Sequence, residues 1–338
     1  MTVPSVEIVP GYRISQLIKG GWQTIGRGAD AIDDLLAFVR AGVTTFETAD
    51  SYAGGEVLMA ALRGAAHQRL APEVAEAVKI HTRFTAPLSG AAPTEGDVRA
   101  DVERSLKTLG VERIDLVQIQ WWNPQIPGLI DAAMVLTDLQ REGKIELLGT
   151  CNLGVTDLRG LIDAGMPVAT SQVLYAPIDR RAENAMADFC RTNGIALLTF
   201  APLAGGFISD RWRGADDPAS TGARYSKEYR ALIEVGGGWA RYQTLLGAFA
   251  SIARQLDRPL ATVALRWVLQ FGPGQAILFG ASSADRLTDL LSVFDFTLDE
   301  AARAEIDATD FVRSTLDIGE IERAPDSDMM RAIRGDIS

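Results

Sequence analysis

Four polar residues at the ends of predicted strands have the types needed for proton exchange with a bound molecule. Glu47 and Tyr52 lie in residues 46–52, where a short strand enters a loop. Lys79 closes a second short apolar run, and Gln120 closes a third. A free phenol has a pKa near ~10, and a neighbouring ammonium favours its ionised form. A carboxylate, a phenol and an ammonium at one edge would form an acid–base site, to which an amide adds hydrogen bonds but no titration.

Eight short apolar runs alternate with segments of helical period, and these elements must position the four residues. Strands are predicted at 16–19, 44–48, 78–82, 114–120, 145–150, 167–173, 195–200 and 275–279. Helical spacing marks 31–41, 94–109, 128–142, 158–164, 181–193 and 244–271. Strands that alternate with helices form a parallel sheet, and eight of them predict an α/β fold of the (β/α)₈ TIM-barrel type. A doubly wound sheet stays open on pattern alone.

The whole chain, residues 1–338, fits one barrel domain. Its hydrophobic content of 47% is enough for a large core. Within residues 1–15, two short runs flank Pro10-Gly11 and predict a hairpin that caps the closed end of the barrel. A long loop is predicted over about residues 204–242, and the charged tail at 311–338 either covers the barrel mouth or is partly disordered.

Composition restricts the partners and the compartment. The formal net charge of −11 and the pI near 4.8 argue against a protein that binds nucleic-acid backbones. Cys151 and Cys190 are too few for a disulfide framework or a thiolate zinc site, so no metal is predicted. The first residues lack the basic segment and long apolar run typical of a leader, and no run of ~20 apolar residues follows them. We therefore expect a soluble, cytoplasmic protein without a membrane partner.

From about residue 20 to about residue 301 the sequence resembles the aldo-keto reductases. That family has a tetrad of aspartate, tyrosine, lysine and histidine, in this order, with the acid five residues before the tyrosine. Tyr52 and Lys79 fit this pattern, whereas Glu47 replaces the aspartate and Gln120 replaces the histidine. The resemblance implies an oxidoreductase that transfers a hydride to or from a carbonyl or alcohol carbon of a small molecule. Tyr52 would act as general acid or base, Lys79 would lower its pKa, and Glu47 would hold Lys79.

The resemblance also implies NADP(H) as the cofactor. Cys151, Asn152 and Gln172 would hold the nicotinamide carboxamide, and the ring of Phe200 would stack on the nicotinamide. The full set of implied cofactor residues is Gly21, Trp22, Cys151, Asn152, Gln172, Phe200, Ala201, Pro202, Leu203, Gly205, Arg211, Gly280, Ser282, Arg286 and Asp289.

The segment that follows the last predicted strand has the composition of an anion site. Ser282 and Ser283 lie where a helix should begin, so they would cap it. Free amides at that helix start and the guanidinium of Arg286 would then bind the adenosine 2′-phosphate.

Several alternatives stay open at the predicted mouth. Trp22, Trp121 and Trp122 suggest a flat, apolar or sugar-like substrate, although each alone is more often a packing residue. His81 either lies near the site or forms a local hydrogen bond, and Asp50 is expected to cap the following loop. The departures from the tetrad also fit reduction of an activated C=C bond, or a nucleotide-binding sensor with vestigial turnover.

Overall fold

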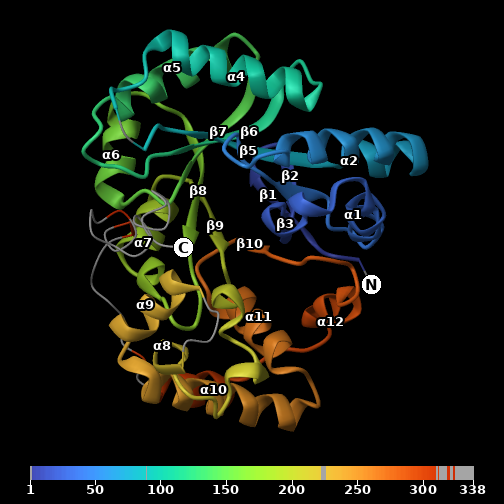
Figure 1. Ribbon diagram of the computed structural model, residues 1–338, viewed down its shortest axis with the longest axis vertical. Helices are drawn as coiled ribbons and strands as arrows, with labels where there is room; N and C mark the ends of the chain where they lie inside the picture. Colours follow the sequence, from blue (N-terminus) through green and yellow to red (C-terminus); the bar gives the residue numbers. More distant parts are fainter. Residues whose placement is uncertain are drawn as a thin grey trace.

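Eight parallel strands close into a barrel in this computed structural model, which describes residues 2–88, 90–221, 226–309, 311, 318, 319 and 323. The strand order is β10-β3-β4-β5-β6-β7-β8-β9, and every neighbouring pair is parallel. All eight predicted strands and the (β/α)₈ TIM-barrel fold are confirmed (Figure 1). The barrel strands are β3 (Leu17–Gly20), β4 (Thr45–Glu47), β5 (Lys79–Thr85), β6 (Ile114–Gln120), β7 (Ile145–Cys151), β8 (Val168–Leu174), β9 (Ala196–Phe200) and β10 (Ala276–Phe279).

Helices surround the barrel because each crossover connection must cover the outer face of a parallel sheet. The α-helices are α1 (Ala31–Arg40), α2 (Gly55–Arg69), α3 (Pro72–Glu76), α4 (Glu95–Leu109), α5 (Leu129–Arg141), α6 (Val155–Asp163), α7 (Ala185–Thr192), α8 (Pro218–Thr221), α9 (Lys227–Val235), α10 (Gly238–Leu256), α11 (Leu260–Phe271), α12 (Leu287–Leu291) and α13 (Glu300–Asp307). Short 3₁₀ segments are η1 (Trp22–Asp30), η2 (Arg181–Glu183), η3 (Ala204–Gly206), η4 (Asp210–Trp212) and η5 (Ser292–Phe294). None of the described helices is both long and apolar enough to cross a membrane.

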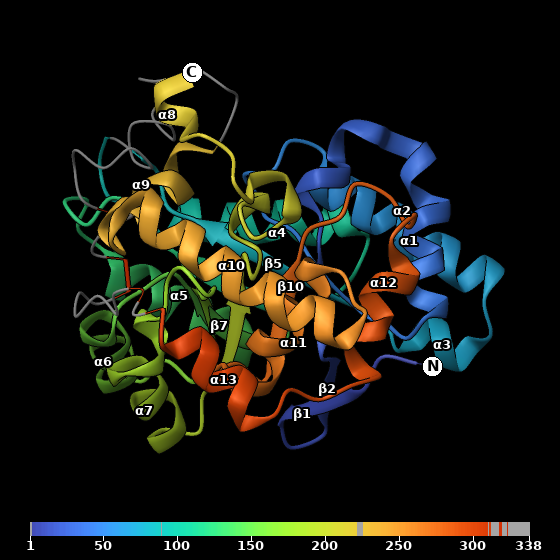
Figure 2. The ribbon, with the colours of Figure 1, turned by 90° about the horizontal axis from the view of Figure 1, so that it is seen from below.

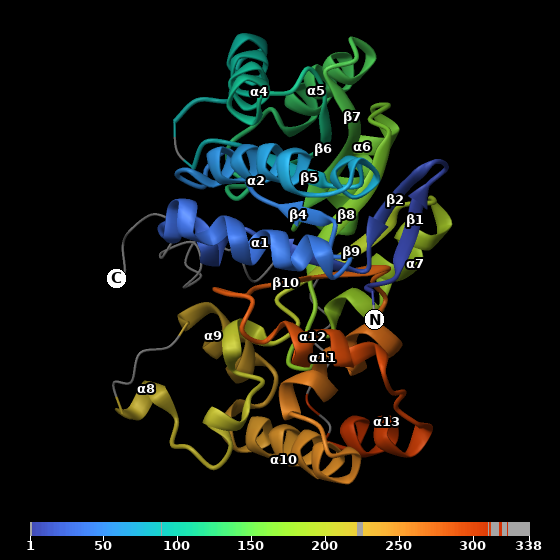
Figure 3. The same ribbon diagram turned by 90° about the vertical axis from the view of Figure 1, so that its right-hand side faces the viewer.

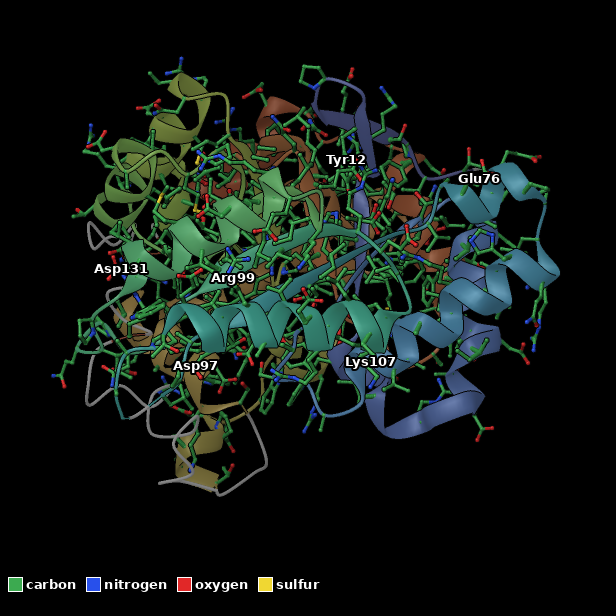
Figure 4. The ribbon with its side chains drawn as sticks, turned by 90° about the horizontal axis from the view of Figure 1, so that it is seen from above. Tyr12, Glu76, Asp97, Arg99, Lys107 and Asp131 are labelled. Carbon is green, nitrogen blue, oxygen red and sulfur yellow. The ribbon has the colours of Figure 1, made fainter. Side chains whose placement is uncertain are left out.

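Local sequence explains where individual helices begin and end. Thr94 and Asp97 form a capping box at the start of α4, and Asp97, Arg99 and Lys107 follow one another along this helix in Figure 4. The segment of helical spacing at 244–271 is divided between two helices, because α10 ends at Leu256 with Asp257 as a left-handed C-cap and Pro259 precedes α11.

The predicted hairpin is confirmed as the antiparallel pair β1 (Ser5–Val9) and β2 (Tyr12–Ser15). Side chains of Ile8, Tyr12 and Ile14 pack against residues at the N-terminal ends of barrel strands, including Ala196 and Ala276. Figure 3 shows the hairpin at one end of the barrel and α8 and α9 at the opposite end. The hairpin therefore closes the barrel bottom, and the strands' C-terminal ends form the mouth.

The stretch predicted as a long loop at 204–242 contains regular structure. It holds η3, η4, α8 and α9, and it leads into α10 (Figure 2). Trp212, Trp239 and Tyr242 surround the buried ring of Phe207 at centroid distances of 5.0, 6.3 and 6.1 Å. Four aromatic residues in this stretch thus build a local core.

Candidate active site

Arg83 is the centre of a polar cluster at the barrel mouth. Its Nη2 donates to Oε1 of Glu47, and its Nη1 donates to Oη of Tyr52 at 2.9 Å and to Oε1 of Gln120 at 3.4 Å. The guanidinium carbon also lies 5.3 Å from the Tyr52 ring centroid. Glu47 ends β4, Arg83 lies in the C-terminal half of β5, and Gln120 ends β6, so three neighbouring strands build the cluster.

The predicted contact of Lys79 with Glu47 and Tyr52 is wrong. Lys79 is the first residue of β5, not its end, and therefore lies towards the closed bottom of the barrel. Its Nζ lies 3.7 Å from Oδ1 of Asp115 and 5.1 Å from the ring centroid of Tyr12 (labelled on β2 in Figure 4). The cation beside Tyr52 comes from four residues further along the same strand.

Alternation along β5 is the signal that would have identified Arg83. Residues two apart on a strand face the same side, so Lys79, His81 and Arg83 all face the barrel interior. The apolar pattern predicts that the strand ends at 82, but β5 runs to Thr85. This extension brings Arg83 level with the mouth.

His81 lies at the barrel bottom, where it forms a hydrogen bond away from the site. It is fully buried, and its Nε2 lies 3.3 Å from Oη of Tyr12. Burial lowers the pKa of His81 to about 4. His67, the second histidine of the chain, is exposed on α2. Neither histidine touches Tyr52.

Asp50 caps the loop that carries Tyr52, as expected. Its carboxylate accepts from the backbone N–H and the hydroxyl of Thr85 at 2.9 and 2.6 Å, and from the N–H of Ser51 at 2.7 Å. Burial raises the pKa of Asp50 to about 6. This carboxylate ties the end of β5 to the Tyr52 loop and so positions Arg83 against the phenol.

Tyr52 is held as a neutral phenol. Burial raises its pKa well above the ordinary value near 10. Because Arg83 donates to the phenol oxygen, the phenol's own hydrogen is directed to another acceptor. Trp22 lies against the outer side of the Tyr52 ring, with ring centroids 4.9 Å apart, and 63% of the Trp22 surface is exposed. A ligand could therefore meet both rings at the mouth.

Gln120 has a defined amide orientation. Its Oε1 accepts from Arg83, so its Nε2 is the end that can donate to a ligand. Gly21, which follows the neighbouring strand β3, is fixed beside Glu47, since its N–H donates to the Glu47 carbonyl at 2.8 Å. A Cβ at Gly21 would lie 2.9 Å from that oxygen, which explains the glycine.

Two buried amides beside this cluster have unused hydrogen-bonding groups. Both Oδ1 and Nδ2 of Asn152 and Oε1 of Gln172 are buried without a partner among the described residues. Asn152 also has a φ of 56°, a left-handed conformation that is uncommon outside glycine. The thiol of Cys151 lies 3.9 Å from Nε2 of Gln172, and burial raises its pKa. Unpaired buried amides are costly, so this arrangement indicates a ligand that pairs with them.

The turn after β9 is also conformationally unusual. Ala201 and Ala204 have φ values of 57° and 48°. At Gly205 the φ is 60°, and an added Cβ would lie 2.5 Å from the ring of Tyr229. Pro202 is buried, and Phe200 and Leu203 are half-buried. Strained backbone of this kind gathers at ligand sites.

The segment after β10 differs from the expected capped helix. α12 begins at Leu287, is five residues long, and has no side-chain cap at Arg286. Ser283 lies four residues before the helix, and its hydroxyl is hydrogen-bonded to the carboxylate of Asp285. The predicted capping by Ser282 and Ser283 is therefore wrong.

Other predicted residues of this region are at the surface or pack locally. Ser282, Arg286 and Asp289 are exposed, and an added Cβ at Gly280 would lie 2.4 Å from Nε2 of Gln23. Arg211 is exposed and its guanidinium stacks 4.8 Å from the ring centroid of Trp212.

Among the described residues, no contact joins the two tryptophans after β6 to the Arg83 cluster. Trp121 is buried, and its Nε1 donates to the carbonyl of Ile126 at 2.9 Å. It lines a separate cavity of about 310 Å³ together with Asp157 and Arg323, which form an ion pair at 2.5 Å. Trp122 is half-buried. Most of the predicted tail at 311–338 lies outside the described residues.

Comparison with known proteins identifies the family of this chain. A model of the Aldo/keto reductase family matches residues 16–310. The chain belongs to the aldo-keto reductase family.

The NADH-specific methylglyoxal reductase of Escherichia coli (strain K12) is 26% identical over 60% of this chain and 61% of that protein. The uncharacterized oxidoreductase YrpG of Bacillus subtilis (strain 168) is 26% identical over 86% of this chain and 90% of that protein. The glycerol dehydrogenase of Gluconobacter oxydans has the same fold, with a TM-score of 0.72 at 21% identity over 93% of this chain and 96% of that one.

Proposed function

We propose that this protein is an NADP(H)-dependent carbonyl reductase in which Tyr52 is the proton donor and Arg83 holds it. The observation that carries the proposal is the hydrogen bond from Arg83 Nη1 to Tyr52 Oη. It joins a neutral phenol, a fixed cation and the buried carboxylate of Glu47 at the barrel mouth, where barrel enzymes place their catalytic groups.

The unpaired amides fit the nicotinamide end of the cofactor. A carboxamide has one acceptor oxygen and an NH₂ donor, and these complement Nδ2 of Asn152 and the oxygens of Asn152 and Gln172. The half-buried face of Phe200 would lie against the nicotinamide ring. When bound, the reduced nicotinamide supplies the hydride.

The chain's own residues account for the proton. The hydroxyl of Tyr52 would donate to the carbonyl oxygen of the substrate, and Nε2 of Gln120 would be the second donor to that oxygen. Arg83 would stabilise the negative charge that remains on Tyr52 after transfer. Burial raises the pKa of Tyr52, so the phenol carries the proton that reduction of a carbonyl requires.

Support for NADP(H) comes from Arg286. Its side chain is exposed, and its guanidinium makes no hydrogen bond or ion pair with the described residues. The oxygens of a 2′-phosphate would accept hydrogen bonds from such a guanidinium. NADH lacks this phosphate and would not gain these bonds.

The test uses the wild type and Tyr52→Phe. We expect NADPH to bind both proteins within a few-fold, because the phenol hydroxyl acts in the chemistry rather than in dinucleotide binding. Turnover at 340 nm should be lost in Tyr52→Phe on a panel of short aldehydes and ketones that includes methylglyoxal. An unchanged rate in Tyr52→Phe would refute the assigned role. Binding without any carbonyl turnover by the wild type would favour an enone reductase or a sensor, and an enone panel separates these two.

A further inference from the structure

Asp34 of α1 is bonded to the segment after β10. Its Oδ1 accepts from the backbone N–H of Ala284 at 3.2 Å, and its Oδ2 accepts from Nη1 of Arg27 at 2.5 Å. The same Nη1 donates to the carbonyl of Ser282. Figures 1 and 2 both show α12, which follows this segment, on the same side of the barrel as α1. Asp34 and Arg27, which are distant in sequence from the loop after β10, thus hold that loop in place.

The position of this loop connects it to the cofactor. β10 is the eighth strand of the barrel, and barrels often bind phosphate at the loops after the last two strands, beside a short extra helix. Arg286, at the end of the loop, is the residue to which the proposed function assigns the 2′-phosphate. The inference below rests on that proposed function.

The negative charge of Asp34 disfavours binding of a phosphate at this loop. Its carboxylate accepts the hydrogen bond of the Ala284 N–H, which would otherwise be available to a bound anion. It also compensates the positive charge of Arg27. The side chains of Asp34 and Arg27 are 22% and 37% exposed, so solvent weakens their field but does not abolish it. A 2′-phosphate carries between about −1 and −2 charges and would be repelled by this carboxylate.

We propose that the Asp34–Arg27 pair is a specificity-determining element that limits the preference for NADPH over NADH. Arg286 favours the phosphate, and Asp34 opposes it by occupying an amide and neutralising a second guanidinium. Removal of the Asp34 charge frees Arg27 and increases the discrimination. Removal of Arg27 leaves the Asp34 charge uncompensated and decreases it.

The experiment measures Kd for NADPH and for NADH by fluorescence quenching and calorimetry, without turnover. For Asp34→Asn we expect NADPH to bind about three- to tenfold more tightly, and for Arg27→Ala about three- to tenfold more weakly, the size expected of a partly exposed charge pair. NADH should change less than twofold in both variants. The opposite shifts of NADPH should shrink in high salt.

Asp33→Asn is the matched control. Asp33 is the neighbouring residue on α1, its side chain is 88% exposed, and it pairs with Arg69 instead of the loop. It should leave both dissociation constants unchanged. Equal shifts for NADPH and NADH in Asp34→Asn, or weaker NADPH binding, would overturn the inference and make Asp34 a brace for the loop. Absence of binding by either dinucleotide to the wild type would instead refute the proposed function, and the inference with it.

Discussion

At the scale of single residues, Arg83 distinguishes this site from the tetrad that the sequence suggests. A lysine is a compact charge that titrates when desolvated, whereas an arginine stays protonated and offers a planar fork of donors. Arg83 uses that fork to bond Glu47, Tyr52 and Gln120 together. In the proposed function, Tyr52 alone therefore supplies the proton.

Arg83→Lys should keep the fold but lower kcat for carbonyl reduction by roughly 10- to 100-fold, because one ammonium cannot reproduce the fork and ~1 Å of misplacement costs about that much. The pH profile separates positioning from mere packing. The wild-type rate should be flat from about pH 7 to 9, above the pKa of Asp50, whereas a partly desolvated lysine titrates below its ordinary value and should introduce an alkaline loss. Superimposable profiles and rates would contradict the assigned role. Lys79→Met serves as control and should retain kcat, since Lys79 lies at the barrel bottom.

Gln120→Leu tests the second donor. Loss of a preorganised donor to a developing oxyanion typically costs about 10²–10³ in kcat, so we expect a fall of this order with little change in NADPH affinity. Gln120→His should retain part of the rate, because imidazole can also donate to the carbonyl. A kcat of Gln120→Leu within twofold of the wild type would show that Gln120 only packs.

Spacing predicts some of this cluster and misses its centre. The five-residue interval of the tetrad that the sequence resembles identifies Glu47 and Tyr52, and the end of an apolar strand identifies Gln120. Arg83 is missed because the apolar pattern of β5 stops before the strand does, so that Lys79 takes its place in the sequence interpretation. The backbone N–H and hydroxyl of Thr85 donate to Asp50 at the end of the strand, and a contact between residues so far apart in sequence leaves no mark on local periodicity.

At the scale of elements, β5 joins both ends of the barrel. Its first residues contact the hairpin, where His81 meets Tyr12, and its last residues build the mouth. One end of the strand thus contacts the hairpin that closes the barrel, and the other end carries Arg83 at the mouth. Strand and helix existence follows from periodicity, but the length of β5 and the break between α10 and α11 depend on capping and tertiary contacts.

The His81 contact predicts how stability depends on pH. The pKa of His81 is lowered from 6.5 to about 4 in the folded state, so its contribution is complete above pH 6.5 and is lost as the pH falls towards 4. Asp50, whose folded pKa is raised to about 6, has the opposite sign, since its contribution is complete below pH 3.8 and is lost as the pH rises through about 6.

Comparison with His81→Gln isolates the histidine, because Asp50 is present in both proteins. Between pH 7 and 4.5 the free energy of unfolding of the wild type should fall by roughly 2 kcal/mol more than that of His81→Gln, at about 1.4 kcal/mol for each unit of pKa difference. Urea unfolding at both pH values measures this difference. Parallel losses in the two proteins would contradict a buried neutral His81.

At the scale of the whole molecule, the closed barrel gathers residues from seven strands, β3 to β9, or the turns after them at one mouth. The eight-fold alternation of strand and helix is a property of the entire sequence, which is why the fold can be predicted without any structure. The loops cannot, because their course depends on contacts such as that between Asp34 and Ala284, 250 residues apart. Fold and family are thus clear from the sequence, whereas the cation beside Tyr52 and the loop after β10 need coordinates.

The most direct test of the account traces the hydride itself. The wild type and Tyr52→Phe are each incubated with NADPH deuterated at the transferable position and with a short aldehyde, and the product is examined by mass spectrometry and NMR. The account predicts deuterium on the carbinol carbon with the wild type and none above background with Tyr52→Phe, although both bind the dinucleotide. Equal label transfer by the two proteins, or no transfer to any carbonyl by a wild type that binds NADPH, would contradict a carbonyl reductase in which Tyr52 supplies the proton.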